Sequence, residues 1–283
     1  MLSIGNDRLG LSVSPDFGAR VLSLTDRNSG RQWLVTGSQS AETGEDAVYG
    51  ADEAVGWDEC FPTVLSCDHP AWGRLRDHGA LWGRRWLVDR ADPDCIEARF
   101  ETPRFRFVRR LTVADAAVVA DYSVTNLGPG PMPYLWSQHC LLATRPGDRI
   151  DLAGHEKMRV GGDPLYWPDH QGRDLGTVGP LEDGFALKTY SETPHRASAA
   201  IVGADGGITF EWEDVPAFGL WLCYGGWPQG NPVHQVAMEP TTAPADDLAA
   251  ADAAGHARTL GAHETHGWSV RITLTAPDER TLQ

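Results

Sequence analysis

Sequence patterns that identify several common enzyme classes are missing from this chain. No GxGxxG follows an expected strand, no GxxxxGK[ST] loop is present and no GxSxG elbow occurs. The sequence therefore gives no support for dinucleotide, nucleotide or α/β-hydrolase chemistry. HETH at 263–266 is one residue short of HExxH and precedes an expected strand, so it does not form a zinc-binding helix. Any active site must come from residues dispersed along the chain.

Cysteine pairs and long hydrophobic runs are also absent. The five cysteines are scattered and include no CxxC pair, which fits neither a disulfide framework nor a zinc knuckle. No stretch approaches the ~20 apolar residues of a membrane helix, and the N-terminus lacks the regions of a signal peptide. We therefore expect a cytoplasmic protein that does not bind or cross a membrane.

Positive charge is in short supply. The formal net charge is −15 and the pI is near 5.0, whereas 41% hydrophobic and 22% charged residues are ordinary for a globular protein. Nucleic acids and anionic membranes both require a basic face. The composition thus excludes them as partners and disfavours a strongly anionic substrate.

The dominant periodicity along the chain is two. Apolar and polar residues alternate in 118–125, 207–213 and 268–274, and turn sequences separate such segments at 26–30, 126–131 and 203–207. The one helical signal lies in ADDLAAADAAG (245–255), where Asp246 or Asp247 could cap a short helix that ends at Gly255. This pattern predicts an all-β protein with few short helices, a large antiparallel β-sandwich formed by one domain over residues 1–283.

Two long segments, 37–85 and 153–184, do not alternate and are rich in Gly, Pro, Asp, Trp and His. Loops of this length in a compact domain are usually functional or disordered, and their aromatic residues favour order. Tryptophan beside acids and histidines is typical of a sugar site, because the ring stacks on a pyranose while carboxylates bind its hydroxyls. Since most of the eleven tryptophans should fill the core, we expect one or two to contact a ligand.

The segment VAMEPTTAPADDL (236–248) places a carboxylate after three apolar residues. Because proline donates no ladder hydrogen bond, Pro240 is expected to end the strand and leave Glu239 at its exposed end or on its last rung. On this segment alone, Glu239 is either an ordinary surface residue or a functional group.

Together these segments resemble the galactose mutarotase-like, or aldose 1-epimerase, superfamily. The resemblance spans nearly the whole chain in the family's order. GARVLSLTDRNSGRQWL (18–34) matches the opening hairpin, and LGAHETHGWSVRITL (260–274) matches the closing strand without the usual LxPGE turn. His78 in DHGALWGRRW matches the first active-site histidine, His139 in PYLWSQHC the second, and Glu239 in AMEP the catalytic glutamate.

The resemblance implies an aldose 1-epimerase that interconverts the α and β anomers of a free sugar. Glu239 would be the base at the C1 hydroxyl, His139 the acid at the ring oxygen and His78 a supporting hydrogen-bond donor. This chemistry requires no metal, nucleotide or other cofactor. The expected partner is a small-molecule sugar, and the protein would be a monomer or a homodimer.

One segment departs from the family. Where the best-known members place an arginine that contacts the sugar, this chain has GWDECFPTV (56–64). We expect Trp57, Asp58 and Glu59 to line the pocket instead, which disfavours a sugar phosphate unless Arg85 or another nearby arginine compensates. Arg85 and Trp167 are the remaining expected substrate contacts.

Two alternatives remain open at this point. A glycoside-active enzyme would pair Glu239 with Asp58 or Glu59, about 5–5.5 Å apart for retention or 6.5–9.5 Å for inversion. A non-catalytic carbohydrate-binding protein would keep the pocket without the reaction.

Overall fold

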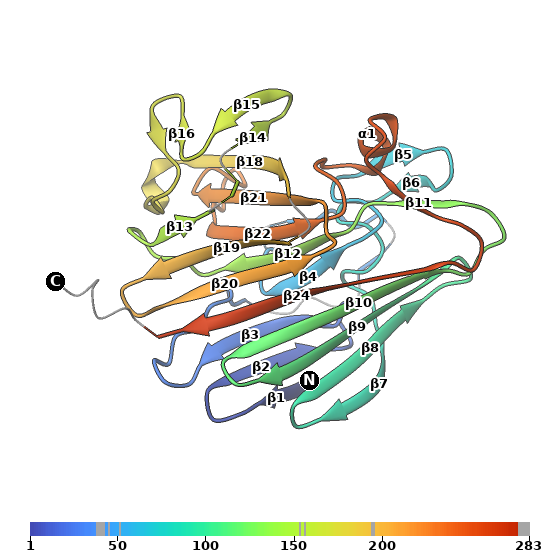
Figure 1. Ribbon diagram of the computed structural model, residues 1–283, viewed down its shortest axis with the longest axis horizontal. Helices are drawn as coiled ribbons and strands as arrows, with labels where there is room; N and C mark the ends of the chain where they lie inside the picture. The colour runs from blue at the N-terminus through green and yellow to red at the C-terminus, as the bar shows by residue number, and fades with distance from the viewer. Residues whose placement is uncertain are drawn as a thin grey trace.

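Two large antiparallel β-sheets form the structure, which is a computed structural model (Figure 1). It describes residues 1–37, 43–44, 46–50, 52–152, 154–155, 157–193 and 196–276. The described part of the chain contains no helix that is both long and apolar enough to span a bilayer. The all-β sandwich predicted from the sequence is confirmed.

The first sheet has twelve strands and carries the candidate site. Their order across the sheet is β1 (Leu2–Gly5), β2 (Leu9–Ser14), β3 (Arg20–Asp26), β4 (Trp57–Cys60), β12 (Ser137–Leu142), β22 (His234–Thr241), β21 (Ala217–Tyr224), β18 (Phe185–Glu192), β14 (Lys157–Val160), β15 (Asp163–Tyr166), β16 (Asp169–His170) and β17 (Arg173–Asp174). The central strands β4, β12 and β22 come from three distant parts of the sequence, so residues remote along the chain become neighbours.

The second sheet has eight strands. Their order is β13 (Arg149–Asp151), β19 (Arg196–Gly203), β20 (Gly206–Glu213), β24 (Thr265–Thr275), β10 (Ala117–Asn126), β9 (Phe105–Ala114), β8 (Cys95–Glu101) and β7 (Leu87–Asp92). Two small hairpin-like pairs complete the set, β5 (Cys67–His69) with β6 (Gly73–Leu75) and β11 (Met132–Tyr134) with β23 (Arg258–Leu260).

The expected alternation produces the core between these sheets. On β20 the side chains of Ile208, Phe210 and Trp212 are buried, whereas Glu211 and Glu213 are exposed. Residues of both sheets belong to one continuous apolar cluster. At roughly 1.5–3 kcal/mol for each fully buried large apolar side chain, this cluster is the main source of stability.

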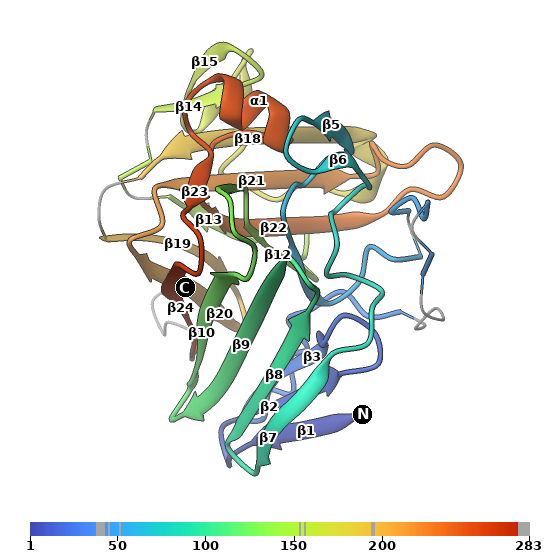
Figure 2. The same cartoon turned by 90° about the vertical axis from the view of Figure 1, so that its right-hand side faces the viewer.

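The single α-helix in the described residues, α1 (Leu248–Ala253), lies where the sequence predicts it. Asp247 is the N-cap, and its side chain accepts a hydrogen bond from the amide of Ala250 at 2.7 Å. A short 3₁₀ turn, η1 (Leu181–Asp183), is the other helical element. Figure 2 shows α1 beside the β5–β6 hairpin, which it contacts.

The expected end of the strand at Pro240 is wrong. β22 continues through Pro240 to Thr241, and only 1% of Glu239 is exposed. The paired positions on the β12 side skip Pro240, so that no ladder hydrogen bond is required there from a residue that has no amide hydrogen. Glu239 is consequently a buried carboxylate in mid-strand, and its burial demands a partner.

Candidate active site

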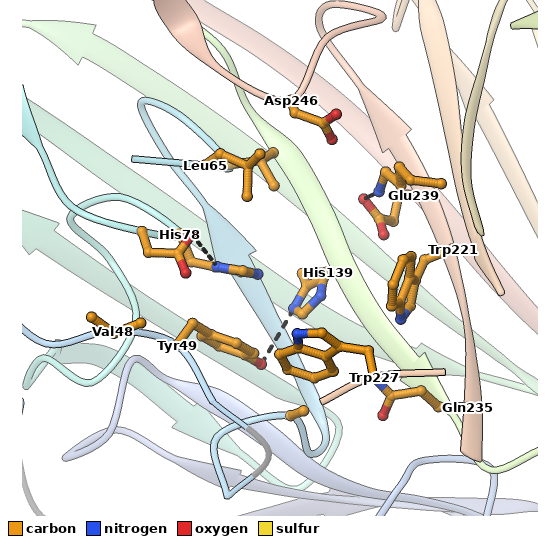
Figure 3. A pocket seen from close by; sticks show the side chains of 14 residues that line it. Val48, Tyr49, Leu65, His78, His139, Trp221, Trp227, Gln235, Glu239 and Asp246 are labelled. Carbon is orange, nitrogen blue, oxygen red and sulfur yellow. Dashed lines mark hydrogen bonds and ion pairs between the residues drawn. The ribbon is translucent and has the colours of Figure 1, made fainter. Parts of the chain in front are cut away.

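A cavity of about 420 Å³ lies over the central strands of the twelve-stranded sheet. Its size is within the range of small-molecule sites. Figure 3 shows His139 near its centre, with His78 and Tyr49 on one side and Trp221 and Glu239 on the other. Further lining residues include Leu65, Asp77, Lys188, Trp227, Gln235 and Asp246. Glu239, His139 and His78, the three residues matched to the family's catalytic positions, therefore line one cavity.

Strand register explains how two of these residues meet. Ser137 pairs with Thr241 and Cys140 with Met238, so the same register places His139 on β12 opposite Glu239 on β22. On the other side of β12, His139 pairs with Asp58 on β4. Opposed residues on neighbouring strands project from the same face of the sheet. Asp58, His139 and Glu239 thus form a row that crosses the three strands β4, β12 and β22 below the cavity.

His139 is oriented by Asp58. Its Nδ1 lies 2.9 Å from Asp58 Oδ1, and the other oxygen of Asp58 pairs with Arg20 at 2.5 Å. Burial alone would raise the pKa of Asp58, but the Arg20 guanidinium and the hydrogen bond from His139 hold that pKa well below its usual range. The ionised carboxylate fixes the proton on Nδ1, which leaves Nε2 of His139 as the nitrogen available to a ligand.

His78 sits on a strained turn. Its φ is +57°, in the left-handed region that non-glycine residues seldom adopt, and its amide hydrogen-bonds the carbonyl of Val64 at 2.5 Å. The imidazole stacks on Tyr49 with ring centroids 3.8 Å apart, and Nδ1 lies 3.2 Å from Asp77 Oδ1. Burial lowers the pKa of His78 despite the hydrogen bond to Asp77, which favours a neutral ring.

Glu239 has two partners on one oxygen. Ser137 Oγ donates to Oε2 at 3.2 Å, and Lys188 forms an ion pair with the same oxygen. Four residues earlier on β22, the buried side-chain oxygen of Gln235 has no hydrogen-bond partner among the described residues. Both Gln235 and Glu239 therefore offer an oxygen to a polar ligand in the cavity.

The structure removes Trp57 and Glu59 from the expected sugar contacts. Neighbouring residues on β4 point to opposite faces of the sheet. Trp57 and Glu59 therefore face the core, whereas Asp58 between them lies on the face that carries the cavity. Glu59 accepts hydrogen bonds from the ring nitrogens of Trp57 and Trp136, from the hydroxyl of Tyr122 and from Arg109, all at 2.9–3.0 Å. It is the acceptor of a buried network.

The structure also leaves Asp58, Arg85 and Trp167 out of the cavity lining. Asp58 reaches the cavity through His139 and does not itself line it. Arg85 is 73% exposed and pairs with Asp16 at 3.1 Å, outside the cavity. Trp167 follows β15 at the far end of the sheet and packs against the core cluster.

Several lining residues were not found from the sequence, namely Tyr49, Lys188, Trp221, Trp227 and Gln235. Two of these residues are tryptophans, which lie on β21 and just after it and not in the long loops where the sequence analysis looked for ligand contacts. The sequence did contain a feature that could have identified Lys188. The chain holds only two lysines, and this one follows three apolar residues, FAL, at the start of a strand. Its partner could not be read from the sequence.

One group in the described residues has the composition of a metal site. Cys60, His78 and His139 each offer a ligand atom, and these atoms lie within 4.8 Å of one another. Tetrahedral zinc requires bonds of about 2.0–2.3 Å, so the three side chains would have to move closer together around an ion. Burial also raises the pKa of the Cys60 thiol, which favours its protonated form. The arrangement as it stands suits proton transfer better than coordination.

No protein-family model matches the chain, and no curated protein matches its sequence. Solved structures do match. A galactose mutarotase-like protein from Lactobacillus casei has a TM-score of 0.74 at 16% identity, over 97% of this chain and 99% of that one. A galactose mutarotase related enzyme from Lactobacillus acidophilus has a TM-score of 0.73 at 13% identity, over 98% of each chain.

A third match is an aldose epimerase homologue from C. elegans, with a TM-score of 0.69 at 13% identity over 98% of this chain and 99% of that one. At such identities the comparisons establish the fold alone. The chain has the galactose mutarotase-like fold over nearly its whole length, as the sequence motifs predicted.

Proposed function

We propose that this protein is an aldose 1-epimerase. The observation that carries the proposal is the placement of His139 opposite Glu239 at one cavity wall, with His78 at the same cavity. A carboxylate and an imidazole beside one sugar ring are the base and acid that anomer exchange requires.

The proposed reaction moves two protons. Glu239 accepts the proton of the C1 hydroxyl while protonated His139 donates one to the ring oxygen, and the C1–O5 bond breaks to give the open aldehyde. After rotation about C1–C2, the O5 hydroxyl attacks the other face of the carbonyl, returns its proton to His139, and the C1 oxygen regains its proton from Glu239. No net proton or electron is consumed, so the residues end as they began.

The other lining groups support binding of a neutral sugar. Trp221 and Trp227 offer rings for stacking, and Gln235 offers an unpaired carbonyl oxygen. Lys188 is the only lysine or arginine among the described lining residues, and Glu239 already engages it. A phosphorylated sugar would therefore meet Asp77 and Asp246 without a free cation to offset them.

The glycoside-active alternative loses the two carboxylates, Asp58 and Glu59, that the sequence offered as partners of Glu239. Glu59 faces the core, and Asp58 is held by Arg20 and His139. Neither is presented to a bond that Glu239 could reach, whereas a glycosidase needs both carboxylates at the sugar.

The test is one-dimensional NMR of anomer exchange over a panel of free aldoses. We expect at least one aldose to exchange faster with the wild-type protein than in buffer, and Glu239→Gln to reduce that excess rate by about 10²–10⁴ while sugar binding persists. Folded Glu239→Gln protein with undiminished exchange would contradict the mechanism. Binding of a sugar without any acceleration by the wild type would favour the non-catalytic alternative.

A further inference from the structure

Lys188 reaches Glu239 from two strands away. The lysine lies on β18 and the glutamate on β22, with β21 between them. Strands in a sheet lie about 4.8 Å apart, so the lysine and glutamate side chains together span roughly 10 Å across the intervening strand. The ammonium nevertheless forms an ion pair with Glu239 Oε2.

A glycine leaves the space for this crossing. On β21, Gly219 pairs with Glu239 on one side and with Tyr190 on the other. A Cβ at position 219 would lie 3.0 Å from Tyr190 Cε1 and 3.3 Å from Lys188 Nζ, both closer than ordinary contact. The φ of Gly219 is outside the left-handed region, so backbone conformation does not require the glycine. The space that a side chain would need is taken by the Tyr190 ring and the Lys188 ammonium.

The two oxygens of Glu239 are thereby made unequal. Oε2 receives both Ser137 and Lys188, whereas no described residue donates a hydrogen bond to Oε1. A carboxylate with one oxygen held by two donors has a fixed plane, and the remaining oxygen is the one that can accept a proton from a ligand.

No other group near Glu239 supplies a lasting positive charge. Tyr190 on β18, Cys60 on β4 and Cys140 on β12 have pKa values raised by burial and are neutral, and Asp246 accepts a hydrogen bond from Tyr190 at 2.6 Å. The remaining charged or titratable groups that line the cavity are Tyr49, Asp77, His78 and His139, and burial raises the pKa of Tyr49. A carboxylate with 1% exposure is costly to bury without a counter-charge, and Lys188 supplies one.

We propose that Lys188, extended over Gly219, is a positioning residue that supplies the counter-charge of the buried Glu239 carboxylate and aims its Oε1 at the sugar. The proposal rests on the function proposed above. It assigns to Lys188 no contact with the sugar and no proton transfer.

Three variants test the role in the reaction. Lys188→Met should lower kcat by about 10–100-fold with little change in KM, the range expected for loss of one hydrogen bond to a charged group. It should also move the rising limb of the pH–rate profile upward by about one pH unit or more, because the buried carboxylate has lost its cation. Lys188→Arg keeps the positive charge, so its rising limb should stay at the wild-type pH. Lys157→Met, at the only other lysine, is the matched control and should behave as wild type.

Gly219→Ala tests the passage without removing a charge. If the lysine must cross at this glycine, the added methyl group displaces it, and the rising limb should move in the same direction as in Lys188→Met. Thermal melts establish that each variant is folded. A rising limb of the pH–rate profile at the wild-type pH in folded Lys188→Met would overturn the proposal. An unchanged rising limb in Gly219→Ala would show that Lys188 does not need the space at Gly219 to reach Glu239.

A second readout requires no sugar. With two lysines in the chain, ¹⁵N-lysine labelling gives two side-chain Nζ signals, and Lys157→Met identifies that of Lys188. We expect this signal to shift with pH in the wild type as the carboxylate titrates, and to lose that transition in Glu239→Gln. The same transition in both proteins would overturn the pairing. If no aldose is exchanged but the transition depends on Glu239, the pairing stands and the epimerase function fails.

Discussion

His139 and Glu239 lie opposite each other on adjacent strands, so the proposed acid and base share one rung of a sheet. The rung continues to Asp58 on β4, which binds His139 through Nδ1 at 2.9 Å. Side chains anchored on a hydrogen-bonded sheet are held more rigidly than those on loops. The predictions below follow from this row and from the residues behind it.

The two proposed catalytic residues should act as a unit. His139→Asn should reduce anomer exchange by about 10²–10⁴, as Glu239→Gln does, because either change blocks one half of the same proton transfer. The double variant should then lose far less than the product of the two factors. A multiplicative loss, measured with the best aldose at saturation, would show that the residues act in separate steps.

The rate should follow a bell in pH, rising as a carboxylate ionises and falling as an imidazolium loses its proton. Asp58→Asn removes the anion beside His139, which makes the imidazolium easier to deprotonate. The falling limb of the bell should therefore move to lower pH in this variant, while the rising limb stays in place. A falling limb that does not move would show that Asp58 has no influence on the acid.

Substitution of Glu59, one residue further along β4, should lower the stability of the protein and leave its reaction rate unchanged. Burial raises the pKa of Glu59 to about 7 despite the Arg109 guanidinium, so the pair is fully charged only above that pH. There, Glu59→Gln leaves Arg109 buried without its counter-charge, and breaking such a pair typically costs about 3–5 kcal/mol of unfolding free energy. The rate per folded molecule should remain at the wild-type value, because Glu59 faces the core. Urea denaturation gives the first quantity and NMR exchange the second. A changed KM in stable Glu59→Gln protein would return Glu59 to the sugar site.

His266 should link stability to pH. Burial lowers the pKa of this residue from 6.5 to about 4, and its Nδ1 lies 2.6 Å from the hydroxyl of Tyr134. Below pH 6.5 the unfolded chain binds a proton that the folded protein does not take up until about pH 4, so the His266 contribution is complete above pH 6.5 and declines as the pH falls toward 4.

His266→Gln keeps an acceptor for Tyr134 but cannot titrate. Urea denaturation near pH 7 and near pH 5 should therefore show a smaller loss of stability in the variant than in the wild type. Equal losses in the two proteins would assign the acid sensitivity to other groups.

Metal removal should leave activity unchanged. The proton transfers proposed for Glu239 and His139 require no metal, and the Cys60, His78 and His139 atoms are spread over up to 4.8 Å. We expect the same exchange rate before and after EDTA treatment, and the same rate in Cys60→Ser. Activity that EDTA abolishes and a divalent ion restores would assign the histidines to a metal.

Much of the site was accessible from the sequence because its motifs keep their order. The period-two segments predicted β10, β20 and β24, three strands of the eight-stranded sheet, and of the two cap candidates Asp246 and Asp247 the structure has Asp247. The motif matches selected Glu239, His139 and His78, three residues that line one cavity. The expected end of the strand at Pro240 failed, because a proline can remain in a central strand where the ladder beside it is interrupted.

Alternation along β4 determined that Trp57 and Glu59 share a face and that Asp58 has the other. Which face is the core was decided only by the second sheet, which brings Arg109 and Tyr122 to Glu59. The pairing of Lys188 with Glu239 likewise depends on the order β18–β21–β22 and on Gly219 between them. A sequence records the spacing of residues within a strand, whereas contacts between strands depend on sheet order and register, which only the folded chain establishes.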